Sequence, residues 1–513
     1  MTDQDPRPTI ALVPLDERPA CAHLPVAVAR IAGVRAVLPP PRLLPSGRVP
    51  GDPDALGRWL SGTARSAVAA VVSLETLGYG GLIASRTRDA TIAEVTRRWT
   101  ALRDLARPGT PVHAVTLITR TPDSPDAGEE PSYWDPHGPA LHQYSAHLHR
   151  HGGAAVPPPP ELPAEVRADF LRRRLRNHAL NIAALELVAD ATLTSLVIGA
   201  DDTAPFALAT AELGWLGTWN DWLGTQRRVT VRPGADEACS TLVARCLVDH
   251  FGGPPPTVTV EAVDPRGLAR IAPYENVTVA ETARGQIHAC GARPADPSDR
   301  ADVHLLVHTP DGSGDWAVDP PDRSGADRAA RHGADRLAGR AADLIAAGRS
   351  VAVADCAQPN GADPLLVDAL VRHGVLEHLS GYAGWNTAGN TLGSTLAQAV
   401  AVHTARRAGT FDRTAHHTLL LHRLLEDWAY MTHVRTELRR RLGSDPTRHD
   451  HVPDGHPLLA DAEQLLRDHR DLLPAFGGLT VTPGTLRLPW QRTFEADFAL
   501  SPRRPTHPAE DHR

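Results

Sequence analysis

Ser195-Leu-Val-Ile-Gly-Ala-Asp-Asp-Thr-Ala-Pro-Phe206 combines a short apolar run with a pair of adjacent carboxylates. The run Leu196–Ile198 predicts a buried strand. Asp201 and Asp202 come directly after it, where the chain turns and both side chains can be aimed into one cleft. Groups at the carboxyl end of a buried α/β strand lie where such folds place their sites. The alternative is that one aspartate caps the next helix and the other is solvated.

Apolar strands alternate with amphipathic helices on both sides of this stretch. The other expected strands are 10–15, 34–38, 69–74, 112–118, 228–232, 257–261, 303–307 and 350–354. The expected helices include 23–31, 54–64, 90–105, 165–188 and 240–251, whereas 123–144 is predicted to be a polar insert. This order predicts a parallel sheet with helical crossovers. We therefore expect an α/β fold whose N-terminal part is a (β/α) barrel or a doubly wound sheet.

The chain of 513 residues is too long for one ordinary domain. The breaker sequence Gly252-Gly-Pro-Pro-Pro256 marks the first expected boundary. It separates an α/β domain at 1–252, which carries the aspartate pair, from a second, smaller α/β unit at 257–410. The remainder, 411–513, is predicted to be mostly helical.

Composition excludes several classes of function. The formal net charge is −7, and all 53 basic residues other than histidine are arginines, so neither nucleic acid nor an acidic membrane is an expected partner. Without lysine, a Schiff-base, pyridoxal or phosphate-loop lysine is excluded. The five cysteines form no CxxC pair, and neither a signal peptide nor a membrane-spanning apolar run is present. We expect a cytoplasmic protein and leave its oligomeric state open.

Charged residues follow nearly every predicted strand. They are Asp16 and Arg18, Glu75, Arg120, Asp201 and Asp202, Asp236 and Glu237, and Asp355. If the strands are parallel, these groups converge at one edge of the sheet. Helix capping would account for one or two of the acids, but arginine does not cap the start of a helix. We therefore expect a shared site.

Three further stretches carry candidate binding residues. Gly78-Tyr-Gly-Gly81, with Tyr79, fits a tight turn better than a phosphate cradle. Arg173, Asn177 and Asn181 are spaced by four on one predicted helix, where they form either a solvated stripe or a pocket wall.

The third of these stretches runs from Ser380 to Gly393. An exposed Trp385 beside Asn386 and Asn390 would suit a sugar, because the indole stacks on a pyranose and the amides bond its hydroxyls. The alternative is a glycine-rich turn with a core tryptophan. Asn360 follows the strand that ends before Asp355 and is expected to line the same binding site.

Five longer strings carry a resemblance to a known family. They are Pro14-Leu-Asp-Glu-Arg-Pro19, Leu77-Gly-Tyr-Gly-Gly-Leu-Ile-Ala-Ser-Arg86, Gly199-Ala-Asp-Asp-Thr-Ala-Pro-Phe206, Tyr382-Ala-Gly-Trp-Asn-Thr-Ala-Gly-Asn390 and Pro489-Trp-Gln-Arg-Thr-Phe-Glu495. These strings make the chain resemble the bacterial domain-of-unknown-function family numbered 4127. The resemblance extends over nearly the whole length of the chain. That resemblance implies no established reaction. Glu75 stands where an aspartate is expected, and Ala207 where a glycine is expected.

A fainter resemblance is to substrate-assisted N-acetylhexosaminidases, in which an acidic pair ends a barrel strand. It implies that Asp201 orients the substrate's acetamido group and that Asp202 is the general acid, without a cofactor. The expected function is therefore a glycoside hydrolase-like activity on a small amino sugar or oligosaccharide. Two alternatives remain open. One is a hydrolase or lyase that holds Mg²⁺ or Mn²⁺ through these acids, and the other is a protein that binds a small ligand without chemistry.

Overall fold

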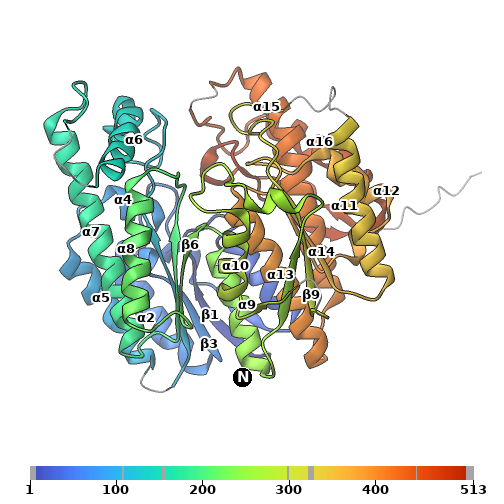
Figure 1. Cartoon of the computed structure of the whole chain (residues 1–513), viewed down its shortest axis with the longest axis horizontal. Coiled ribbons are helices and arrows are strands. Elements are labelled where there is room, and N and C mark those ends of the chain that lie inside the picture. Colours follow the sequence, from blue (N-terminus) through green and yellow to red (C-terminus); the bar gives the residue numbers. More distant parts are fainter. Residues whose placement is uncertain are drawn as a thin grey trace, which may run out of the picture.

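The computed structural model describes residues 7–106, 109–152, 157–296, 300–321, 328–445 and 448–503. Residues 1–6, on which the expectation of no signal peptide rests in part, lie outside the described residues, as does 504–513 of the expected C-terminal region. The described chain contains two parallel sheets with helices around them, followed by a largely helical C-terminal region (Figure 1). The α/β fold predicted from the sequence is confirmed.

The first sheet has six parallel strands in the order β2-β1-β3-β4-β5-β6. They are β1 (Thr9–Val13), β2 (Arg35–Val37), β3 (Ala69–Ser73), β4 (Val112–Ile118), β5 (Ser195–Ala200) and β6 (Val229–Pro233). Since β2 and β6 each pair on one side only, the sheet is open. Of the two architectures left open by the sequence, the doubly wound sheet is the one observed. All residues of β3, β4 and β5 are buried, as expected for a sheet with helices on both faces.

A helix or a group of helices follows each strand of this unit, and the last of them, α9, leads out of the sheet. They are α1 (His23–Ile31), α2 (Pro53–Thr63), α3 (Leu74–Tyr79), α4 (Leu82–Thr87), α5 (Ile92–Ala106), α6 (Trp134–Arg150), α7 (Ala164–Ala189), α8 (Leu208–Trp222) and α9 (Ala238–Phe251). Two of them correct the sequence interpretation. The insert 123–144 contains the start of α6, and the glycine-rich turn after β3 contains α3, which ends in a left-handed Gly80.

The second sheet has five parallel strands in the order β11-β10-β9-β7-β8. Its strands are β7 (Thr257–Glu261), β8 (Arg293–Pro294), β9 (Val303–His308), β10 (Val351–Asp355) and β11 (Gly381–Ala383). Its helices are α10 (Val279–Ala289), α11 (Arg328–Ala346), α12 (Pro364–Arg372) and α13 (Ala388–Ala408).

The C-terminal region packs against the second sheet. It contains α14 (Arg413–Arg423), a π-helical segment (Leu424–Val434), α15 (Arg435–Leu442), α16 (Leu458–Asp471) and an antiparallel pair, β12 (Leu479–Val481) and β13 (Leu500–Pro502). Its apolar side chains share one buried cluster with β10, α11 and α12. None of the helices in the described part of the chain has the length and apolar character needed to cross a membrane.

Helices α9, α10 and α13 lie between the two sheets (Figure 1). One buried apolar cluster includes side chains from α1, α9, α10 and α13 and from strands of both sheets, so the core continues from one unit into the other. The division of the chain at 252–257 stays a prediction.

Both sheets have the same strand order around a reversal point. The chain leaves β1 for β2 on one side and returns to β3 on the other, and it passes from β7 to β8 and back to β9 in the same way. Open α/β sheets bind ligands outside the carboxyl ends of the strands at such a reversal. In the first sheet this crevice lies beyond β1 and β3, where Asp16 and Arg18 follow β1.

Candidate functional site

The first group of charged side chains joins the ends of β1 and β6. Arg18 donates from Nε and Nη2 to both carboxylate oxygens of Asp16, with 2.7 Å between Nη2 and Oδ2. The same Nη2 lies 2.6 Å from Asp236 Oδ1. Asn386 Nδ2 donates to Asp236 Oδ2 at 3.3 Å, and Asn390 Oδ1 accepts from the Asp236 backbone N–H at 3.1 Å. The structure thus brings together five residues singled out from the sequence, from both sheets.

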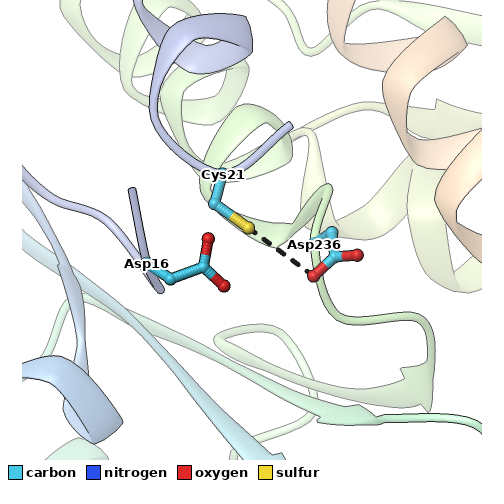
Figure 2. A group of neighbouring side chains, drawn as sticks. All are labelled: Asp16, Cys21 and Asp236. Atoms are coloured by element: carbon cyan, nitrogen blue, oxygen red, sulfur yellow. Dashed lines mark hydrogen bonds between the residues drawn. The ribbon is translucent and has the colours of Figure 1, made fainter. Parts of the chain in front are cut away.

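Asp16, Cys21 and Asp236 have potential metal-ligand atoms within 4.8 Å of one another (Figure 2). Two features of the donor set fit a metal poorly. Arg18 already supplies a cation to both carboxylates. Burial, followed by the two nearby carboxylates, raises the pKa of the Cys21 thiol well above its usual value, and a thiol ligates metals as the thiolate.

The second group surrounds the predicted pair at the end of β5. Arg86, from α4, donates to Asp201 Oδ2 through Nη2. Arg120, just after β4, donates to Asp202 Oδ2 through Nη1 at 2.9 Å. Neither aspartate side chain accepts a hydrogen bond from the start of α8, so the capping alternative does not describe this pair. Each aspartate has its own guanidinium.

Two glutamates that the sequence analysis did not single out bridge these arginines. Glu129 Oε2 accepts from Arg86 at 3.0 Å and from Arg120 at 3.1 Å. Glu130 Oε1 accepts from the same two arginines at 3.1 and 2.8 Å. Arg86 therefore contacts three carboxylates at once. Its planar fork of five donors makes this possible.

A further arginine joins the two groups into one network. Arg492 donates to Glu129 Oε1 and, at 3.3 Å, to Glu495 Oε1. Glu495 Oε1 lies 3.7 Å from Arg18 Nη1. The charged groups at the ends of β1, β4, β5 and β6 are therefore linked through side chains from the segment 489–495. This segment contributes to the family resemblance of the sequence, but the sequence alone predicted no functional role for it.

The carboxyl groups of the network differ in proton affinity. Burial, followed by the charge of Asp201, raises the pKa of Asp202 from 3.8 to about 6, although Arg120 and Arg86 oppose the shift. Burial also acts to raise the pKa of Glu129, but Arg492, Arg120 and Arg86 outweigh it and hold that pKa well below its usual range. Burial likewise raises the pKa of Glu495 to about 7, so the network contains two carboxyls that can exchange a proton near neutrality and one, Glu129, that stays ionised.

A pocket of about 690 Å³ borders this network. It lies between the segments 46–48, 128–129, 449–454 and 487–492. Glu129 and Arg492 belong both to its wall and to the charge network. His449 also lines it. The cavity volume is in the range of small-molecule sites.

Several residues other than glycine adopt the left-handed region around the network. Asp202 has φ of 33°, Asn386 has φ of 60°, and Asn360 has φ of 62°. Trp490 and Gln491, in the pocket wall, both have φ of 55°. Such conformations disfavour the folded state unless the surroundings impose them, and they cluster at functional sites.

Three of the residues predicted to bind substrate instead support the end of β4. Glu75 Oε1 accepts from the Leu117 N–H at 2.8 Å, and burial raises its pKa to about 7. Asn177 and Asn181 each donate to the Leu117 carbonyl oxygen, at 2.9 and 3.2 Å. These side chains are bonded to backbone, and they hold the strand that carries Arg120.

Four predicted residues lie outside the network. Tyr79 is buried beneath Arg176, whose guanidinium carbon is 5.1 Å from the ring centre. Glu237 is buried and paired with Arg232. Asp355 accepts from the Asp363 N–H at 2.7 Å, and Asn360 donates to Asp315 at 2.9 Å.

The expectation of an exposed Trp385 is wrong. The side chain is only 2% exposed and belongs to the apolar cluster of the second sheet. Its ring packs edge-on against Phe494, with 6.3 Å between ring centres. The glycines near it, which suggested a loop, allow close helix packing instead: a side chain at Gly393 would lie 2.2 Å from Glu237 Cγ. Trp385 is thus a core residue next to the site.

A family model described as "Protein of unknown function (DUF4127)" matches residues 10–499. The chain belongs to this family. No curated protein and no solved structure matches it significantly. The family match covers every residue of the network, from Asp16 to Glu495, and confirms the resemblance noted from the sequence.

Proposed function

We propose that the chain is a glycoside hydrolase-like enzyme acting on a small amino sugar or oligosaccharide. Asp202 is the general acid and Asp201 orients the substrate. The observation that carries the proposal is that two adjacent carboxyls, each bound to a different arginine, belong to a charge network that reaches a pocket through Glu129 and Arg492. Two carboxyls held in different surroundings can take separate acid and partner roles in glycoside hydrolysis.

The accessibility of the two carboxyls supports this assignment. The Asp202 side chain is 28% exposed, and that of Asp201 is 13% exposed. A general acid must reach the glycosidic oxygen, so the more accessible carboxyl suits that role. A pKa of about 6 leaves an appreciable protonated fraction near neutral pH. Asp201, held by Arg86, suits a residue that fixes a substrate group.

The reaction would follow the substrate-assisted scheme. Asp202 gives its proton to the leaving oxygen as the glycosidic bond breaks, and the substrate's acetamido oxygen bonds to the anomeric carbon. Water then opens this cyclic intermediate and returns a proton to Asp202. The scheme needs no metal or redox partner.

The metal-dependent alternative has less support because every carboxylate predicted as a metal ligand forms an ion pair with an arginine. These carboxylates are Asp16, Asp201, Asp202, Asp236 and Glu237. An oxygen site for Mg²⁺ or Mn²⁺ would have to displace these guanidinium groups. A chelator should therefore leave activity unchanged.

The test is hydrolysis of a panel of 4-nitrophenyl glycosides that includes N-acetylhexosaminides. We expect turnover of at least one member, and Asp202→Asn should lower kcat by about 10²–10⁴-fold, the usual contribution of a general acid. Binding of substrate should persist in this variant. Asp343→Asn, at an exposed position on α11, is the matched control. No turnover of any glycoside, or full activity of Asp202→Asn, would contradict the proposal.

A further inference from the structure

Glu17 lies between Asp16 and Arg18 in the chain but lines the 690 Å³ pocket. Its Oε1 accepts two hydrogen bonds, from the Gly47 N–H and from Trp490 Nε1, both at 2.7 Å. Its Oε2 is buried and has no hydrogen-bond partner. Two donors therefore fix the carboxyl group through Oε1 and leave Oε2 without a partner.

Glu17 also differs from the other carboxylates of the wall in its surroundings. Glu129 is paired with Arg492, Asp450 with Arg439, and Asp497 with His23, while Asp454 is exposed. Across the described residues, no ion pair is formed by Glu17. Burial and then the charge of Asp16 raise its pKa above the usual value, as expected for a carboxyl without a counter-charge. A cationic group on a ligand would offset the free energy that is lost by burying the ionised Glu17 carboxylate.

The charge of the whole wall points to the same kind of ligand. The wall carries five carboxylates and three arginines, so it favours a cation over an anion. The indole of Trp490 is not free to receive that cation. The guanidinium carbons of Arg18 and Arg492 already lie 4.5 Å from its ring centre. An ammonium group would therefore be directed to Glu17, with the ring serving to orient the carboxyl.

We propose that this pocket binds the protonated amine of a free amino sugar, with Glu17 Oε2 accepting from the ammonium group. That the ligand is a sugar rests on the proposed function, whereas the ammonium site rests on the pocket itself. The site would take a sugar unit with a free amine, which is distinct from the N-acetylated unit whose acetamido oxygen takes part in the proposed reaction. An ion pair formed in a partly buried pocket with a hydrogen bond to a charged group contributes about 1.5–3 kcal/mol, or roughly tenfold or more in affinity.

Calorimetric titration of the full chain tests this proposal with three probes: glucosamine, glucose and N-acetylglucosamine. We expect glucosamine to bind about tenfold or more tightly than either uncharged sugar. Glu17→Gln should remove that preference while leaving the weak binding of glucose unchanged. Glu165→Gln, at an exposed position on α7, should retain it.

Trp490→Phe provides a second variant that keeps an aromatic ring but removes the N–H donor to Glu17. We expect it to weaken glucosamine binding by less than Glu17→Gln does. Equal binding of all three sugars, no binding of glucosamine, or an undiminished preference in a folded Glu17→Gln variant would overturn the proposal. Since no turnover is measured, failure of the glycosidase assay with preserved glucosamine binding would refute the proposed reaction alone.

Discussion

Replacing Asp202 with asparagine should stabilise the protein at alkaline pH while lowering the rate of turnover. Burial and the neighbouring Asp201 raise the pKa of Asp202 from 3.8 to about 6. An acid whose pKa is raised by folding binds its proton more tightly in the native state, so ionisation disfavours that state. The penalty is absent well below pH 3.8, grows between 3.8 and 6, and is complete above 6. Asparagine cannot ionise and avoids it.

The magnitude follows from the shift itself. A difference of about 2 pKa units corresponds to about 3 kcal/mol at pH 8 and to less than about 1 kcal/mol at pH 4. For a chain of this length the unfolding entropy is about 1 kcal/mol/K, so the full effect is a rise in Tm of about 3 °C. Loss of the charge contact with Arg120 is already included, because that contact opposes the shift.

Thermal unfolding followed by circular dichroism at pH 4, 6 and 8 measures this effect. The difference in Tm between Asp202→Asn and wild type should grow with pH, whereas Asp343→Asn should show a flat difference. A Tm for Asp202→Asn that is unchanged or lower at pH 8, or raised equally at pH 4 and 8, would refute the account of Asp202. It would then be an ordinary partner of Arg120.

Three other outcomes are expected. Asn181→Leu removes a buried donor from the end of β4 and should lower the free energy of unfolding by about 1–3 kcal/mol, measured in urea. The pKa of Glu75 is raised to about 7, so Glu75→Gln should gain stability over wild type as the pH rises from 4.5 through 7, measured by thermal unfolding. All five cysteines are buried, so a thiol reagent should label them only after denaturation; rapid labelling of Cys21 in the native protein would mean that its pocket opens.

The fold was predictable where one local signal dominated. The strand at 112–118 and the helix at 23–31 were predicted with the bounds observed, because apolar β-rich runs and helical periodicity are local properties. Helix α3 was missed because Gly78 and Gly80 in a short segment suggest a turn. The choice between a barrel and an open sheet depends on which strands pair at the edges, and no local pattern records this.

The candidate site was predictable only in part, for a similar reason. Asp201, Asp202 and Arg120 could be found because they follow predicted strands directly. Glu129 lies in an insert, and Arg492 lies near the end of the chain, so only the folded structure shows that they touch. Trp385 shows the opposite error, since its neighbouring glycines serve close packing and not exposure.

The arrangement of arginines argues that the network serves a function beyond holding the fold. Taking ion pairs out of water is costly, and apolar residues of similar volume often stabilise a core as well or better. Here four arginines and seven carboxylates are gathered, and burial, followed by the charge of Asp201, leaves Asp202 with a raised pKa. Asp202 also has a left-handed backbone. Both features oppose folding. A purely structural network would lose nothing by replacing Asp202, whereas a site that must give and recover a proton needs this carboxyl held in this state.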